Sequence, residues 1–210
     1  MKEKTIRTCA DCTVIACDGK SSVFPDFCIT GKLDEKEKEK ILEIYNEPEN
    51  GTVMKEAACV EAEGYMQKTR VEEIIDFAGR LGAKKLGIAT CVGLIRETRI
   101  LTKILRKNGF EVYGVACKAG AVNKTKVGID PKCLEVGENM CNPIMQAKIL
   151  NEQATDLNIV MGLCVGHDSL FYKYSEALTT TLVTKDRVLG HNPVAALYTA
   201  ESYYSRLMEK

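Results

Sequence analysis

The stretch that decides the fold is KKLGIATCVGL, residues 84–94. Its short apolar run ends at Cys91, and the segment 93–109 that follows has apolar residues at helical spacing. The same order of apolar run and helical pattern returns three more times before the end of the chain. Such alternation is typical of parallel strands joined by right-handed crossover helices. We therefore expect an α/β fold, in which residues 84–210 form a Rossmann-like open parallel sheet of about four strands. The expected strands are residues 84–90, 110–116, 157–163 and 179–185, and the expected helices are 93–109, 142–155, 166–177 and 192–210.

The part of the chain before residue 84 has a different pattern. Residues 1–32 are rich in Cys, Asp, Gly and Ser and have little apolar periodicity, which indicates a compact knuckle ordered by something other than a core. Residues 33–83 have helical patterns at 33–45 and 54–81, separated by NEPENG. We expect three parts: a metal-binding knuckle (1–32), a helical segment (33–83) and the α/β domain (84–210).

Three expected strands each lead directly into a cysteine: Cys91, Cys117 and Cys164. The carboxyl ends of parallel strands meet at one edge of a sheet, where ligands bind, and neighbouring strands lie ~4.8 Å apart. If the strands are neighbours, the three thiols can share one metal centre. Cysteine is also a common buried residue that packs like a small hydrophobe, so this alternative stays open for each one.

Further ligands for the same centre follow in the loops. Cys141 precedes an expected helix, whose dipole favours a thiolate, and Cys133 lies in the long loop before it. His167 follows Cys164 at metal-ligand spacing, although its ring can equally lie in solvent. His191 is a weaker candidate, and Cys59 is either a core residue or a ligand of one of the two sites.

The N-terminal set, Cys9, Cys12, Cys17 and Cys28, is the stronger signal. Four thiolates can hold one tetrahedral Zn²⁺ or an iron–sulfur cluster, and either would supply folding free energy to this stretch. A redox-active CxxC and inert thiols are the alternatives. The CxxC of thioredoxin-like proteins belongs to a βαβ unit, whereas this one precedes the α/β region.

Composition excludes several classes of function. The 210 residues contain 29 Lys plus Arg and 29 Asp plus Glu, so net charge favours neither nucleic acid nor an anionic membrane as a partner. No secretory signal pattern opens the sequence and no apolar run is long enough to span a membrane, so we expect a cytoplasmic protein in which ten cysteines stay reduced. GxGxxG, Walker and GxSxG motifs are absent, which argues against dinucleotide binding and serine hydrolysis.

Several motifs resemble those of a known family: CADC with the following Cys17, GIATCVGL, GVACKAG, GLCVGHDSLF and GHNP. They are similar to the family called domain of unknown function 1847, described as metal-binding proteins largely from anaerobic bacteria and archaea. The resemblance spans nearly the whole chain and implies metal binding through cysteines, without indicating a substrate. More distantly, three cysteines on one α/β edge resemble the cluster-dependent desulfidases, in which three thiolates hold a cubane and leave one iron free for substrate sulfur.

Two main functions follow from these patterns. The first is a metalloprotein that stores, senses or carries a metal ion or cluster, with an iron–sulfur cluster, Zn²⁺ or both as cofactors. The second is an iron–sulfur-dependent enzyme with an open coordination position and a small-molecule substrate. Whether the protein is an enzyme, and its oligomeric state, stay open. Candidate helpers of such an enzyme are Arg96, Glu97, Lys118, His167, Asp168 and Ser169.

Overall fold

The computed structural model describes residues 6–209, so residues 1–5 of the expected knuckle and Lys210 lie outside the described residues. The chain divides into two compact units, Met1–Ala58 and Cys59–Lys210. This boundary falls inside the segment 33–83, which we expected to be one helical part. The three-part assignment of roles stays a prediction.

The first unit contains short helical turns and very little core. Three 3₁₀ turns, η1 (Cys9–Asp11), η2 (Ala16–Asp18) and η3 (Thr30–Lys32), precede helix α1 (Glu35–Tyr45), and α2 (Pro48–Gly64) begins in this unit. Ala16 is the only buried residue among residues 6–58. Apolar burial therefore contributes little to the order of this unit.

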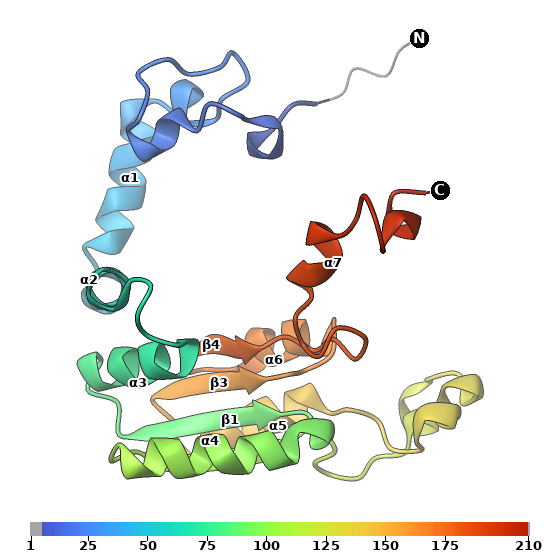
Figure 1. Ribbon diagram of the computed structural model, residues 1–210. Coiled ribbons are helices and arrows are strands. Elements are labelled where there is room, and N and C mark those ends of the chain that lie inside the picture. Colours follow the sequence, from blue (N-terminus) through green and yellow to red (C-terminus); the bar gives the residue numbers. More distant parts are fainter. Residues whose placement is uncertain (1–5, 210) are drawn as a thin grey trace. The chain divides into compact units, whose positions relative to one another are not determined.

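The second unit is built on a four-stranded parallel sheet, as the sequence predicts (Figure 1). Its strands are β1 (Lys85–Thr90), β2 (Glu111–Ala116), β3 (Leu157–Met161) and β4 (Leu178–Val183). They pair in the order β2-β1-β3-β4. Because the chain passes from β2 to the far side of β1, the order reverses between β1 and β3, and open sheets bind ligands beside such a reversal.

Helices cover both faces of this sheet. Helices α3 (Arg70–Arg80) and α4 (Ile95–Lys107) pack on one face, and α5 (Pro143–Glu152) and α6 (His167–Tyr174) pack on the other. All five residues of β3 are buried, as are all of β1 after its first residue. Burial on both faces explains why these strands are continuous apolar runs rather than alternating ones.

Close packing also fixes one glycine in β1. A Cβ on Gly87 would lie 1.9 Å from Oδ1 of Asn158 in the neighbouring strand. Asn158 is fully buried, and its Oδ1 accepts a hydrogen bond from Thr155 Oγ1 at 2.9 Å while its Nδ2 donates to Ser175 Oγ at 2.8 Å. The missing side chain at residue 87 therefore makes room for a satisfied polar group in the core.

Some expected helices are wrong. The segment 54–81 is two helices, α2 and α3, because Thr69 caps α3 in a capping box with Glu72. NEPENG ends α1 at Tyr45, as expected, but the next helix begins before residue 54, since Pro48 takes the first position of α2. The long loop 117–140 contains two 3₁₀ segments, η5 (Lys124–Val127) and η6 (Pro131–Val136).

The expected C-terminal helix, 192–210, is also wrong over most of its length. Only α7 (Val194–Tyr198) and the turn η7 (Ser205–Leu207) form within it. Tyr198 and Tyr203 are largely exposed, so their burial does not stabilise a longer helix. Within residues 6–209, no helix has both the length and the apolar character needed to cross a membrane.

Candidate metal centre

The ends of β1 and β2 hold two of the predicted ligands in fixed positions. The backbone N–H of Cys91 donates to Met161 O at 3.1 Å, and that of Cys117 donates to Thr90 O at 2.8 Å. Both residues therefore continue the pairing of the sheet beyond the strands. Cys91 and Cys117 are buried, with 7% and 3% of their surface exposed.

A buried glutamine on α5 adds hydrogen bonds to this edge of the sheet. Gln146 Nε2 donates to Thr90 O at 3.1 Å and to Val115 O at 2.7 Å. One amide thus bridges β1 and β2 within two residues of each cysteine. Its Oε1 has no hydrogen-bond partner among the described residues.

The thiol of Cys117 lies at the centre of a small cluster. Its Sγ is 3.9 Å from Sγ of Cys141 and accepts the backbone N–H of Val92 at 3.3 Å. Cys141 is brought to this position because the N–H of Asn142 donates to Cys117 O at 2.7 Å, just before α5 begins. Cys91 interacts with the same thiol from the end of β1.

These contacts change the acidity of the cluster. Hydrogen bonding to Cys117 lowers the pKa of Cys91 to about 5 against the effect of burial, with help from the Gly93 N–H and from Lys185. Hydrogen bonding to Cys117 likewise lowers the pKa of Cys141 to about 5. The pKa of Cys117 itself is raised, because Cys141 and Cys91 both favour its protonated form. The cluster therefore holds two thiolates around one shared thiol near neutral pH.

Cys164 has a different partner. Arg187, in the loop after β4, donates from a guanidinium nitrogen to Cys164 Sγ at 3.1 Å. This hydrogen bond and the charge of Cys164 raise the pKa of Arg187, and the charges of Cys91 and Cys141 act in the same direction. The guanidinium thus lies where it interacts with three of the predicted ligands at once.

One cavity, of about 920 Å³, joins the whole strand-edge set. The predicted ligands that line it are Cys91, Cys117, Cys133, Cys141, Cys164 and His167, and the weaker candidate His191 lines it too. His167 Nδ1 is buried without a hydrogen-bond partner among the described residues. Lys118 lines the cavity, whereas the other suggested helpers, Arg96, Glu97, Asp168 and Ser169, do not.

The four N-terminal cysteines line a second, smaller cavity of about 290 Å³ in the first unit. These are Cys9, Cys12, Cys17 and Cys28, and they share the cavity mostly with apolar side chains. Of the two alternatives for Cys59, the core residue is wrong, since Cys59 is exposed on α2. Cys59 lines neither of these cavities.

The distance between two of the thiols fits a metal ion, whereas the placement of a third ligand does not. Thiolates that share a tetrahedral ion with ~2.3 Å bonds lie ~3.8 Å apart, and the 3.9 Å between Cys117 and Cys141 matches this value. Within residues 6–209, however, no three His, Cys, Asp or Glu side chains are already placed around one point as an ion requires. A third ligand must therefore rotate into position.

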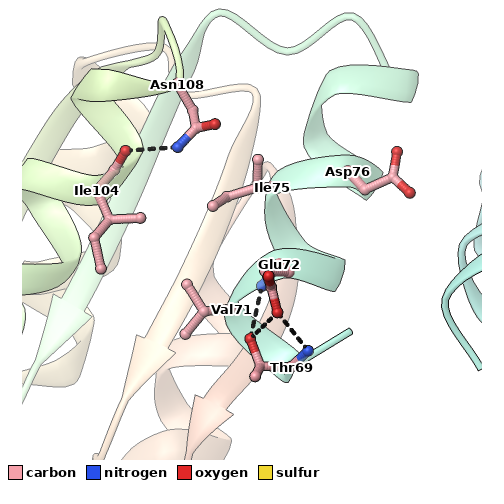
Figure 2. Close-up of a pocket in the computed structure, with 7 residues that line it drawn as sticks. All are labelled: Thr69, Val71, Glu72, Ile75, Asp76, Ile104 and Asn108. Atoms are coloured by element: carbon pink, nitrogen blue, oxygen red, sulfur yellow. Dashed lines mark hydrogen bonds between the residues drawn. The ribbon is translucent and has the colours of Figure 1, made fainter. Parts of the chain in front are cut away.

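A further hollow, between α3 and α4, contains no thiol (Figure 2). Its polar groups serve the ends of the two helices: Thr69 and Glu72 form the cap of α3, and Asn108 Nδ2 donates to Ile104 O at 2.9 Å. Asp76 is paired with Lys68 and Arg80. This hollow is a packing groove and contributes nothing to the metal centre.

Three residues of the strand-edge site were not predicted: Gln146, Lys185 and Arg187. Lys185 and Arg187 follow the fourth strand, and therefore lie at the same edge as the cysteines. The position after the fourth strand is the sequence signal for both residues, and His191 was the only candidate ligand predicted there. Nothing in the sequence marks the amide of Gln146 as a bridge between strand ends.

The family model described as "Protein of unknown function (DUF1847)" matches residues 28–182, about three quarters of the chain. The chain belongs to this family. A relative from Methanocaldococcus jannaschii, "Uncharacterized protein MJ0455", is 51% identical over 185 residues, which cover 87% of this chain and 94% of the relative. All strand-edge cysteines of this DUF1847 protein lie inside the matched segment, whereas Cys9, Cys12 and Cys17 precede it.

Two solved structures of Dph2 from Pyrococcus horikoshii are similar to parts of this chain. One is 18% identical, with a TM-score of 0.36, and the match covers 68% of this chain. The other, described with a 4Fe-4S cluster, is 22% identical, with a TM-score of 0.34, and the match covers 67% of this chain. The chain spans about a third of the length of these Dph2 chains.

Proposed function

We propose that this DUF1847 protein binds metal through thiolates at two places. The first, which we call the strand-edge centre, is built on Cys91, Cys117 and Cys141. Cys164, Cys133 and His167 are available around the same cavity as further ligands. The observation that supports the proposal best is the 3.9 Å distance between Sγ of Cys117 and Sγ of Cys141, in a cavity that five cysteines line.

The protonation pattern suits metal binding, because two of the three thiols are already in the thiolate form that a cation binds. Two thiolates in a partly buried cavity repel each other and lose hydration, and hydrogen bonding with Cys117 offsets this cost. A metal ion replaces that proton, since metal binding to cysteines releases protons. The metal then supplies a Lewis acid, with an open position if only three thiolates bind it.

The role of Cys164 depends on Arg187. While the guanidinium holds Cys164, the cluster offers Cys91, Cys117 and Cys141 to a metal. Release of Arg187 would make Cys164 a fourth ligand and close the site. The structure therefore favours an open three-thiolate centre over the set of Cys91, Cys117 and Cys164 that the strand ends alone predict.

The metal at this edge is Zn²⁺ or an iron–sulfur cluster. The 3.9 Å spacing of Cys117 and Cys141 favours two thiolates on one ion, because a cubane binds each thiolate through a different iron. The cavity of about 920 Å³ has room for the larger group, so a cluster-dependent enzyme is the second candidate. All ten cysteines are free, which fits a reducing, cytoplasmic setting.

The second place is the knuckle, with Cys9, Cys12, Cys17 and Cys28 as ligands. These four side chains line one cavity, and Ala16 is the only buried residue among residues 6–58. A tetrahedral Zn²⁺ or a small cluster would supply the folding free energy that this thin core lacks.

Metal and sulfide analysis of single variants, purified without air, tests the proposal. Cys117→Ser and Cys141→Ser should each remove the strand-edge metal while the knuckle keeps its own. Cys12→Ser should remove the knuckle metal alone and make residues 6–32 sensitive to protease. Cys59→Ser is the matched control, because its exposed side chain lines neither cavity.

The outcome separates the two sites and the two metals. Iron and sulfide in equal amounts identify a cluster, and zinc without sulfide identifies a single ion. If Cys117→Ser and Cys141→Ser retain the metal content of the Cys59→Ser control, the strand-edge centre is refuted. If Cys12→Ser retains both its metal and its protease resistance, the knuckle site is refuted.

A further inference from the structure

Apart from the thiolates, the charged side chains that line the strand-edge cavity are all cationic. Four cationic side chains line it, from Lys118, Lys124, Lys185 and Arg187, and its lining contains no Asp or Glu. For a protein whose total charge is balanced, with 29 basic and 29 acidic residues, this is a strong local excess. Such an excess in a cavity attracts anions.

Two of the four cations serve the fold. Lys118 Nζ donates to Asn139 O at 2.5 Å, and Lys124 Nζ donates to Cys133 O. Both bonds join residues within the long loop 117–140. Lys124 is also buried, so its ammonium group is committed to this role.

Among residues 6–209, the partners found for the other two cations, Lys185 and Arg187, are thiols. Arg187 donates to Cys164 Sγ at 3.1 Å, and Lys185 interacts with the thiol of Cys91. Nζ of Lys185 and Sγ of Cys91 both lie near Gly93, at 4.0 Å and 3.8 Å from the position that a Cβ would take there. Among the described residues, neither cation forms an ion pair with a carboxylate.

Metal binding would reduce the negative charge that faces these two cations. Two free thiolates carry two negative charges, whereas three thiolates on a divalent ion carry one between them, beside four positive side chains. Lys185 and Arg187 are therefore less well balanced when the metal is bound. Unpaired charges in a partly enclosed site are costly, so this arrangement is complete only with an anion.

We propose that the strand-edge cavity binds a small ligand by an oxyanion group, a carboxylate or a phosphate, which Lys185 and Arg187 hold beside the metal. The proposal rests on the proposed function, because the metal must first engage the thiolates. The guanidinium fork matches two oxygens of either group, and the ammonium adds a point charge. The cavity, at about 920 Å³, is in the range of small-molecule sites and has room for a ligand next to the metal.

Calorimetric titration of the full chain with two probes, inorganic phosphate and acetate, tests this site. The protein is titrated in its metal-loaded and metal-free forms at constant ionic strength, and its metal content is measured in the same samples. We expect at least one probe to bind the loaded form more tightly than the metal-free form. Comparison of the two probes distinguishes a phosphate ligand from a carboxylate ligand.

Lys185→Gln and Arg187→Gln should each weaken this binding about tenfold or more, the effect of losing one charge-assisted hydrogen bond. Lys103→Gln and Arg99→Gln are the matched controls, since both side chains are exposed on α4 and do not line the cavity. The controls should bind as the wild type does. Normal metal content in all four variants would show that the loss lies in anion binding.

Three results would overturn the proposal or its basis, and they can be told apart. A loaded protein that binds neither probe refutes the anion site and leaves the metal site intact. Binding that survives in both Lys185→Gln and Arg187→Gln refutes these two residues as the anchor. A protein without metal refutes the proposed function and, with it, the anion site beside the metal, and metal analysis identifies this outcome without the titration.

Discussion

The shared proton of Cys117 makes a prediction that needs no metal. Cys117→Ala removes the thiol with which Cys91 and Cys141 form hydrogen bonds, and this interaction is the largest cause of their lowered pKa values. Both pKa values should therefore rise from about 5 towards the ordinary value of 9.0. With a pKa of about 5, roughly 99% of each thiol is thiolate at pH 7, whereas a thiol with a pKa of about 9 is roughly 1% thiolate.

The assay is the pH dependence of alkylation by iodoacetamide, followed by mass spectrometry on the metal-free protein. Only the thiolate reacts, so Cys91 and Cys141 of the wild type should reach half of their maximal rate near pH 5. In Cys117→Ala the midpoints should move upward, and the rate at pH 7 should fall by up to about 100-fold. Cys59, exposed on α2, provides the internal reference for the reagent.

Cys133→Ala is the control for this experiment, because Cys133 lines the same cavity without being a cause of either shift. It should leave the two midpoints where the wild type has them. Identical alkylation profiles in the wild type and Cys117→Ala would show that no proton is shared, and the reasoning about the cluster would fail.

Two further predictions concern the scaffold. Gln146→Leu removes two hydrogen bonds, to Thr90 O and Val115 O. It should therefore lower the free energy of unfolding in urea by about 1 to 2 kcal/mol and weaken metal binding at the edge. Unchanged stability and metal affinity would contradict the bridging role of Gln146. Asp156 accepts the backbone N–H groups of Lys85 and Lys84, which lower its pKa below 3.8. The stabilising effect of this carboxylate is therefore complete above the pKa that Asp156 has in the unfolded state, and it is lost as the pH falls through the lower pKa of the folded state. Asp156→Asn should therefore lose less stability than the wild type in acid unfolding below pH 3.8. Equal losses of stability in the two proteins would refute this prediction.

The sheet could be predicted from the sequence because its signal is local and repeated. Strands such as 157–163 are apolar throughout, as burial on both faces requires, and each leads into a helical pattern. The C-terminal segment could not be predicted in the same way. Its apolar residues have helical spacing, but a helix also needs a surface on which to bury them, and Tyr198 and Tyr203 have none.

The sequence predicts at which edge of the sheet the candidate site lies, but not which of its cysteines lie closest together. Cys91, Cys117 and Cys164 all line the predicted cavity, because parallel strands bring their carboxyl ends together. The close partner of Cys117 is instead Cys141, which is placed by a backbone bond from Asn142 to Cys117 O. That bond depends on the path of a loop of more than twenty residues, and strand order alone does not determine it.

The positive charge of the site was the feature that the sequence indicated least clearly. Lys185 and Arg187 lie far from the cysteines in the sequence and belong to no motif. They reach the cavity only because β4 pairs with β3 and ends at the same edge. Their positions directly after the fourth strand are the sequence feature that marks them.

The central claim is that Cys117 and its neighbours bind a metal through sulfur. X-ray absorption at the metal edge, on protein purified without air, tests it most directly. The account predicts sulfur scatterers at ~2.3 Å from the metal, and a loss of these scatterers in Cys12→Ser combined with Cys117→Ser. A folded protein without metal, or a metal surrounded only by nitrogen and oxygen, would contradict it.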